Sequence, residues 1–273
     1  MTPNDFRIAF IGGGNMASAI IGGLIKQGVP AAHIEVVEPF EAARMRLQQQ
    51  FGITAQAAAG PALAASQLVV WAVKPQTFKD AAAAVKPHAP NALHLSVAAG
   101  IRSNSIAQWL GTERIVRSMP NTPALVGKGM TALFARSGVL AGDVSTVERV
   151  IATTGEFLWV GSEALLDGVT ALSGSGPAYV FFFLEAMIAA GQQMGLSAAQ
   201  AHKLAVGTFV GASELARASD DPPEVLRERV TSKGGTTYAA ITSMQEAGLQ
   251  EAFIKALHAA QQRAVALGDE FGS

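Results

Sequence analysis

The sequence predicts an α/β fold: a doubly wound, mostly parallel sheet in the first half, followed by a domain made only of helices. Three observations support this. Short apolar runs rich in β-branched residues alternate with helical segments, and a glycine cluster follows the first run. Later segments are long, rich in Ala and apolar at every third or fourth position. Short buried strands separated by helices are typical of a parallel sheet covered on both faces.

Five strands are expected in the first half and four long helices in the second. The strands fall at residues 6–11, 34–37, 68–72, 93–97 and 114–117. Helices are expected at 15–27, at 41–51 and after Pro75, and then at 177–194, 197–218, 236–246 and 250–267. Gly195 and Gly248 separate the later helices. The change of pattern places a domain boundary near Gly161, which gives domains 1–161 and 162–273.

The later helices carry apolar residues on all sides rather than along one stripe, with Phe181, Phe182 and Phe183 in a row. A helix that is apolar all round is buried in the working molecule. The all-helical domain has only about 110 residues. We therefore expect the chain to associate with a second copy of itself through this domain.

Composition limits the class of protein. The 273 residues include 20 Lys+Arg, 21 Asp+Glu and no Cys, with a formal net charge of −1. A near-neutral chain lacks the basic surplus of nucleic-acid-binding proteins, and the lack of Cys excludes disulfides and Cys-held metal centres. The N-terminus does not fit a signal peptide, and the longest apolar runs (68–73 and 179–184) are far below the roughly 20 residues that span a bilayer. We expect a cytoplasmic protein with no membrane or nucleic-acid partner.

A glycine loop after the first strand predicts a dinucleotide site. The segment Gly12-Gly13-Gly14-Asn15-Met16-Ala17 fits G-x-G-x-x-G/A and lies between an expected strand and an expected helix. In this setting the first glycine permits the tight turn, and the second lets the backbone approach a pyrophosphate. The N–H groups at the helix start then face the anion. An ordinary glycine-rich turn is the weaker alternative, so we expect a Rossmann-type sheet that binds NADPH or NADH.

The choice between the two coenzymes stays open. Glu38 closes the second strand, where an acidic side chain normally binds the ribose hydroxyls of NAD and repels a 2′-phosphate. Arg44 and Arg46 follow shortly after and are able to hold such a phosphate.

Two further loops follow strands at the edge of the sheet where ligands bind in open α/β folds. Their small side chains leave room for a ribose and a nicotinamide ring. Lys74 is either a catalytic base, a phosphate contact or a turn residue fixed by Pro75. The expected cofactor-binding residues of these two loops are Ala72, Val73, Lys74, Pro75, Val97, Ala98 and Ala99.

Two motifs stand in the second domain, each before a helix. Residues 172–179 (Leu-Ser-Gly-Ser-Gly-Pro-Ala-Tyr) suit a hinge with a helix cap, and residues 230–237 place two glycines and four hydroxyl residues before an apolar helix. Hydroxyls and free N–H groups at a helix start are suited to a carboxylate, although simple capping is the alternative. The five His residues are scattered without metal-ligand spacing, so no metal site is expected.

Taken together, these motifs resemble those of the pyrroline-5-carboxylate reductases, the enzymes of the last step of proline biosynthesis. The resemblance covers nearly the whole chain, from the Ile11–Met16 loop to the last helix. It rests on four motifs in order: Ala72-Val73-Lys74-Pro75-Gln76, Met119-Pro120-Asn121-Thr122-Pro123, residues 172–179, and Thr231-Ser232-Lys233-Gly234-Gly235-Thr236-Thr237. It implies a Rossmann domain joined to an all-α dimerisation domain, in which helices of two subunits interleave and dimers often assemble into rings.

The resemblance also implies roles for individual residues. Ile11, Gly12, Gly13, Gly14, Asn15 and Met16 would bind the pyrophosphate, and the loops at 72–75 and 97–99 would line the nicotinamide. The substrate would be held by Glu163, Asp220, Ser232, Gly235, Thr236 and Thr237. We expect hydride transfer to the imine carbon of 1-pyrroline-5-carboxylate, with Thr237 hydrogen-bonded to the ring nitrogen. The family mostly uses NADPH, with which Glu38 disagrees.

Two rival functions share parts of this pattern. A β-hydroxyacid dehydrogenase has a similar domain plan but needs a catalytic Lys at the start of the second domain, and residues 173–179 contain none. A nucleotide-sensing protein without turnover would keep the fold, but the intact segment from Ser232 to Thr237 argues against it.

Overall fold

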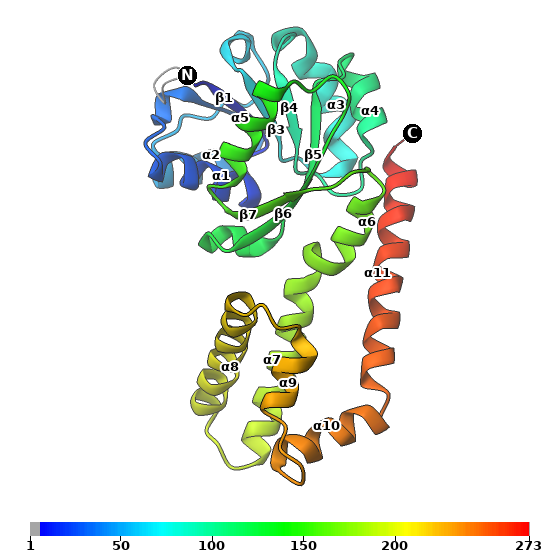
Figure 1. Cartoon of the computed structure of the whole chain (residues 1–273). Helices are drawn as coiled ribbons and strands as arrows, with labels where there is room; N and C mark the ends of the chain where they lie inside the picture. Colours follow the sequence, from blue (N-terminus) through cyan, green and yellow to red (C-terminus); the bar gives the residue numbers. More distant parts are fainter. Residues whose placement is uncertain (1–5, 273) are drawn as a thin grey trace. The chain divides into compact units, whose positions relative to one another are not determined.

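The computed structural model describes residues 6–272, which form two compact units. The sheet unit contains the chain up to Ser175 together with the residues from Ala260 onward, and the helical unit is Gly176–Ala259. Figure 1 shows the elements of both units along the chain. Compactness divides the chain at 175 and again at 260, whereas the sequence pattern changes near Gly161. The first division reflects which residues pack together in space, and the second reflects where the strand-and-helix pattern of the sequence gives way to helices alone. The domain boundary at 161 stays a prediction.

The sheet unit is built on seven strands in the order β2-β1-β3-β4-β5-β6-β7. The first five are parallel neighbours, β6 runs antiparallel to β5, and β7 runs parallel to β6. The strands are β1 Ile8–Ile11, β2 Ile34–Val37, β3 Leu68–Trp71, β4 Leu93–Ser96, β5 Ile115–Met119, β6 Gly129–Ala135 and β7 Gly155–Trp159. The predicted doubly wound fold is confirmed, and all five expected strands are present.

Helices cover both faces of this sheet, as Figure 1 shows. One core contains Phe10, Ile20 of α1, Leu47 of α2 and Val147 of α5. The core on the other face contains Trp71, together with Phe78 of α3 and Ile106 of α4. The helices of the sheet unit are α1 Asn15–Lys26, α2 Glu41–Phe51, α3 Pro75–Val85, α4 Ser103–Leu110, α5 Ala141–Ile151 and α6 Leu165–Val169. Short 3₁₀ turns join them (η1 Ala31–His33, η2 Pro61–Ala65, η3 Lys86–His88, η4 Thr122–Val126), and a π-helical segment, η5, spans Thr170–Gly174.

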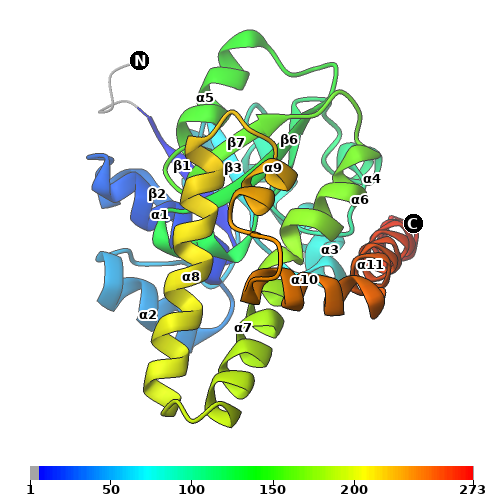
Figure 2. The same cartoon turned by 60° about the horizontal axis from the view of Figure 1, so that its bottom comes forward.

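The helical unit consists of long helices that bury little of themselves. Figure 2 shows α8 running beside α7, and the close approach is made at Gly191, where an added Cβ would lie 3.0 Å from that of Ala201. Only Gly191, Ala201 and Ala205 are buried in this unit. Its helices are α7 Gly176–Gln193, α8 Ala198–Ala218, α9 Pro223–Arg229 and α10 Thr236–Glu246, and α11 Leu249–Phe271 begins here and ends in the sheet unit. The four helices expected from periodicity are α7, α8, α10 and α11.

One helical run is long and apolar enough to cross a membrane by length and composition alone. It spans Leu165–Gln193, with a mean hydropathy of 1.3 in its best window, and only 6% of that window is buried. It is not an uninterrupted apolar run, because Asp167, the Ser-Gly-Ser-Gly-Pro stretch at 173–177 and Glu185 divide it. A single such run is weak evidence for a membrane span, and the run includes the π-helical segment η5.

Candidate active site

The sheet topology brings the predicted coenzyme residues to one edge. β1, β3 and β4 are adjacent parallel strands, so the loops that follow them, at 11–16, 72–75 and 97–99, begin side by side. The backbone continues this alignment beyond the strands, because Ala72 N–H donates to the Ile11 carbonyl and Val97 N–H to the Trp71 carbonyl. The chain moves to β2 on one side of β1 and to β3 on the other. Such a reversal of strand order opens the crevice where dinucleotides bind.

The geometry of the glycine loop fits a pyrophosphate. Gly12 has φ +93°, and a Cβ there would lie 2.5 Å from the Ala72 carbonyl oxygen, so only glycine is accommodated. A Cβ on Gly14 would meet nothing within 4 Å, so this backbone faces open space. Gly14 is also the N-cap of α1, and within residues 6–272 the N–H groups of Gly14, Asn15 and Met16 have no protein partner. Free N–H groups at an uncluttered helix start form an anion site.

Glu38 lies directly after β2 and turns toward the glycine loop. Its Oε2 accepts from Gly13 N–H at 2.8 Å, and its Oε1 accepts from Phe40 N–H at 2.9 Å. The residue is only 6% exposed. Arg44 lies beside the same strand end, where its Nη1 donates to the carbonyl oxygens of Glu38 and Pro39 at 3.0 and 2.7 Å. The carboxylate therefore braces the loop, and a cation lies next to it.

The other two coenzyme loops have the expected small and extended character. Lys74 is the N-cap of α3 with an exposed side chain, and Pro75 takes the first helical position. The Lys74 carbonyl accepts from Thr77 Oγ1 at 3.1 Å. After β4, Ala98 N–H donates to Ser96 Oγ at 3.3 Å. These contacts fix the backbone of both loops and leave the Lys74 ammonium without a partner among the described residues, so its role as a base, phosphate contact or turn residue stays undecided.

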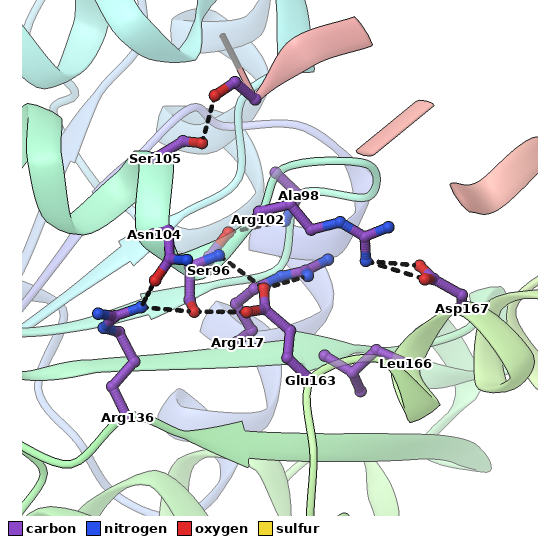
Figure 3. A network of polar contacts seen from close by, with 12 residues as sticks. Ser96, Ala98, Arg102, Asn104, Ser105, Arg117, Arg136, Glu163, Leu166 and Asp167 are labelled. Carbon is purple, nitrogen blue, oxygen red and sulfur yellow. Dashed lines mark hydrogen bonds and ion pairs between the residues drawn. The ribbon is translucent and has the colours of Figure 1, made fainter. Parts of the chain in front are cut away.

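Glu163 stands before α6 and is engaged within the sheet unit, as Figure 3 shows. Its Oε1 accepts from Arg117 Nη1 and from Ser103 N–H, both at 2.6 Å, and its Oε2 accepts from Ser103 Oγ at 2.6 Å. Ser103 Oγ in turn accepts from Arg136, which also contacts Asn104. The carboxylate thus caps the first residue of α4 and neutralises an arginine of β5. This favours a positioning role, and a direct substrate contact by Glu163 stays a prediction.

Burial and pairing set the protonation of this cluster. Burial opposes the charge of Glu163, but hydrogen bonds from Ser103 and Arg117 outweigh it and hold the pKa of Glu163 below its ordinary value. Burial lowers the pKa of Arg117, whose ion pair with Glu163 works in the opposite direction. Next to it, Arg102 Nη1 donates to both carboxylate oxygens of Asp167 at 2.9–3.0 Å. Two ion pairs therefore tie α4 and β5 to the segment that begins the second half.

Two of the motifs that carry the family resemblance meet through Asn121. Its Nδ2 donates to the carbonyl and the Oγ of Ser173 at 3.3 and 3.2 Å, and its Oδ1 accepts from Met130 N–H at 2.9 Å. Close packing accompanies the contact, because a Cβ on Gly174 would lie 2.3 Å from Met119 Cε. The Met119–Pro123 motif therefore holds the glycine-rich segment that leads into α7.

The predicted substrate loop has a helix start without a side-chain cap. Gly234 has φ +75°, and Gly235 is the N-cap of α10 with no side-chain hydrogen bond. Gly235 N–H donates to the Ser232 carbonyl at 3.0 Å, and a Cβ on Gly235 would lie 2.9 Å from Ser232 Oγ. Within residues 6–272, the N–H groups of Thr236 and Thr237 have no protein partner. The loop offers these two N–H groups at the start of α10, and substrate binding by Ser232, Gly235, Thr236 and Thr237 stays a prediction.

Asp220 lies in the turn between α8 and α9 and is exposed. Its neighbour Asp221 is paired with Arg229 at 2.6 Å and contacts Ser219. Asp220 itself has no partner among the described residues. Of the two adjacent carboxylates, Asp221 is thus the one engaged within the chain, and a substrate contact by Asp220 stays a prediction.

Sequence reasoning did not assign roles to Arg117, Ser103 or Arg136. The sequence did contain a signal for Arg117, which lies in an expected buried strand. An arginine is almost never fully buried without a partner, so an acidic partner was to be expected. Among residues 6–272 no group of three His or acidic residues is arranged to hold a metal ion. His94 is a core residue: its Nδ1 accepts from Trp71 Nε1 at 3.1 Å, and burial, followed by the charge of Arg114, lowers its pKa to about 4.

Comparison with known proteins gives the same picture over both halves of the chain. A family model described as pyrroline-5-carboxylate reductase dimerisation matches residues 163–267, and one described as NADP oxidoreductase, coenzyme F420-dependent, matches residues 7–100. A pyrroline-5-carboxylate reductase of Pseudomonas aeruginosa is 44% identical over 97% of this chain and 98% of its own. That of Vibrio alginolyticus is 38% identical over 94% and 96%.

Solved structures agree. A pyrroline-5-carboxylate reductase from Coxiella burnetii matches with a TM-score of 0.89 and 37% identity over 97% of this chain and 99% of that one. A Plasmodium falciparum pyrroline carboxylate reductase, solved with NADP bound, matches with a TM-score of 0.86 and 28% identity over 96% and 98%. The glycine loop, the four ordered motifs and this similarity along almost the whole length place the chain in the pyrroline-5-carboxylate reductase family.

Proposed function

We propose that this protein reduces 1-pyrroline-5-carboxylate to L-proline with NADPH or NADH, the last step of proline biosynthesis. The observation that carries the proposal is the 44% identity to a reductase of that name over 97% of the chain, which spans the coenzyme loop and the substrate loop alike. The loop geometry supports it independently, because the start of α1 offers free N–H groups to a pyrophosphate.

The proposed coenzyme site lies at the carboxyl edge of the sheet. Residues 11–16 would hold the pyrophosphate, and the small residues at 72–75 and 97–99 would border the nicotinamide ring. When bound, the reduced nicotinamide supplies a hydride from C4. The protein contributes alignment, because holding two reactants in contact geometry is worth several kcal/mol.

The proposed substrate site is the start of α10. Ser232, Thr236 and the free N–H groups of the first helical turn would bind the substrate carboxylate. Thr237 would hydrogen-bond the ring nitrogen, and Asp220 would favour its protonated form. The hydride adds to the imine carbon and the nitrogen carries the proton, taken up from solvent, so that the product is the secondary amine of proline. An iminium accepts hydride more readily than a neutral imine, so stabilising the protonated ring is the main task of these residues.

The test follows coenzyme oxidation by absorbance with purified protein, 1-pyrroline-5-carboxylate, and NADPH or NADH. Thr237→Ala is expected to lower kcat about 10- to 100-fold, the loss of one hydrogen bond to a charged group, with coenzyme affinity unchanged. Thr242→Ala, the same change in the interior of α10, is the matched control and should keep wild-type turnover. No oxidation of either coenzyme by folded protein would overturn the proposal, and full activity of Thr237→Ala would remove that residue from the mechanism.

The working assembly is proposed to be at least a homodimer formed through the helical domain, with a larger ring as the further possibility to be measured by mass in solution. The match of residues 163–267 to a dimerisation domain supports the dimer. The proposed location is the cytoplasm, with which a chain without Cys is compatible, and cell fractionation tests it.

A further inference from the structure

We infer that Arg44 is the residue that recognises the 2′-phosphate of NADPH, and that the acidic residue at the end of β2 does not exclude this phosphate. The inference rests on the proposed function in assuming a dinucleotide at the glycine loop, and it decides the coenzyme. It depends on how Glu38 and Arg44 are arranged around the end of one strand.

The first step concerns Glu38. In a NAD-selective site, the acidic side chain after the second strand points to the adenosine ribose and accepts its hydroxyl groups. Here both carboxylate oxygens already accept backbone N–H groups, from Gly13 at 2.8 Å and from Phe40 at 2.9 Å. Only 6% of the residue is exposed. The carboxylate is therefore turned toward the protein backbone, and two N–H donors already offset part of the negative charge that a ribose or a phosphate would meet.

The second step concerns Arg44. One nitrogen of its guanidinium, Nη1, is anchored on the carbonyl oxygens of Glu38 and Pro39 at 3.0 and 2.7 Å. This places the charged group at the strand end where the 2′ position of the ribose lies in Rossmann sheets. Across residues 6–272, Nε and Nη2 of Arg44 make no hydrogen bond. A guanidinium that is fixed through one nitrogen keeps its remaining donors for a planar contact with phosphate, at reduced entropic cost.

Arg46 provides the internal comparison. It lies two residues further along α2, and residues two apart on a helix point to different faces. Arg46 is exposed, and it makes no hydrogen bond or ion pair with any residue of 6–272. The two arginines carry the same charge in the same helix. Comparing the same substitution at both positions therefore distinguishes a specific contact with the phosphate from a general electrostatic attraction.

The experiment measures binding of two nucleotide fragments by calorimetry, adenosine 2′,5′-bisphosphate and adenosine 5′-monophosphate, to wild-type protein and to Arg44→Gln, Arg44→Lys and Arg46→Gln. The wild type should bind the bisphosphate more tightly. Arg44→Gln should weaken it about 10- to 100-fold, as expected for loss of a charge-assisted hydrogen bond, and leave the monophosphate nearly unchanged. Arg44→Lys should keep part of the preference, and Arg46→Gln should keep all of it.

Equal wild-type affinity for the two fragments, no binding of either, or the same effect from Arg44→Gln and Arg46→Gln would overturn the inference. If Arg44→Gln lowers the melting temperature strongly, its weaker binding could come from unfolding, and the Arg44→Lys variant then tests the inference instead. Full retention of the wild-type affinity and preference in Arg44→Lys would show that the planar guanidinium is not used, and would overturn the inference. The test needs no imine substrate. An Arg44-dependent preference without proline formation would therefore reject the proposed function alone, and proline formation with equal use of both coenzymes would reject the inference alone.

Discussion

At the scale of single residues, two glycines of the same loop are glycine for different reasons. Gly12 has φ +93° and its Cβ would strike the Ala72 carbonyl, whereas Gly14 has φ −76° and its Cβ would meet nothing within 4 Å. We expect Gly12→Ala to destabilise the fold by about 2 kcal/mol or more, since an L side chain in a left-handed conformation alone costs 1–2 kcal/mol. Gly14→Ala should leave stability unchanged.

Substitutions of Gly12 and Gly14 are expected to affect different properties, the first stability and the second coenzyme binding. If the pyrophosphate approaches the backbone at Gly14, the added methyl group occupies its place, so Gly14→Ala should weaken NADPH binding more than tenfold while thermal unfolding stays that of the wild type. Denaturant unfolding and fluorescence titration with NADPH measure the two quantities. Unchanged NADPH affinity in Gly14→Ala would place the pyrophosphate elsewhere, and an undiminished stability of Gly12→Ala would contradict the strain argument.

At the scale of elements, the contacts of Glu163 hold the start of α4 to β5. Arg117 is 4% exposed, and removing one partner of a buried ion pair leaves an uncompensated charge. Glu163→Gln should therefore destabilise the protein by about 3 kcal/mol. Glu35→Gln, on strand β2 and without a partner in the described chain, is the control for charge removal and should cost little. A Glu163→Gln protein of normal stability but with a raised KM for 1-pyrroline-5-carboxylate would instead assign Glu163 to the substrate.

The pH dependence follows from the direction of the shift. The folded state holds the pKa of Glu163 below its ordinary value of 4.5, so the unfolded chain takes up the proton first as the pH falls. The stability contributed by Glu163 is complete above about pH 4.5 and is lost as the pH drops below it. The difference in unfolding free energy between wild type and Glu163→Gln should therefore shrink under acid conditions, which denaturant titrations at pH 7 and pH 4 compare.

The elements also show what the sequence is able to predict. Helices with strong periodicity were placed to within a few residues, such as α10 at Thr236–Glu246, because packing and helix propensity agree there. Strands β6 and β7 were not predicted. Strand β7 (Gly155–Trp159) alternates half-buried and exposed residues, and β6 runs antiparallel at the edge of a parallel series. Strand β7 lacks the continuous apolar run that marked the buried strands, and β6 has only the short run Ala132–Ala135, with no glycine cluster or helix start directly after it.

For the site, the sequence predicted the loops better than the side-chain directions. The glycine loop and the start of α10 are recognisable from glycine and hydroxyl spacing, which is a local property. The orientation of the Glu38 side chain depends on a hydrogen bond from Gly13, 25 residues away, and that of Glu163 depends on hydrogen bonds from Arg117 and Ser103. Such contacts depend on the spatial order of the strands, and a short sequence motif carries no information about that order.

At the scale of the whole molecule, the single chain leaves the apolar side chains of its second half in solvent. Phe181 is 58% exposed, Phe182 is 68% exposed, and only three residues of the helical unit are buried. Exposed apolar surface of this extent marks an association site. Burying it between two copies adds stability by mass action, so the melting temperature of the wild type should rise with protein concentration.

Phe182→Glu tests this dependence directly. A symmetric dimer contains the substitution twice, and each copy would place an unpaired carboxylate in an apolar contact at a cost of several kcal/mol. We expect sedimentation to show monomers, and the melting temperature to fall and lose its concentration dependence. Met45→Glu, at a position of α2 that is 66% exposed, introduces the same charge with nearly the same exposure and should leave the assembly intact. If Phe182→Glu sediments like the wild type, Phe182 lies outside the contact between subunits.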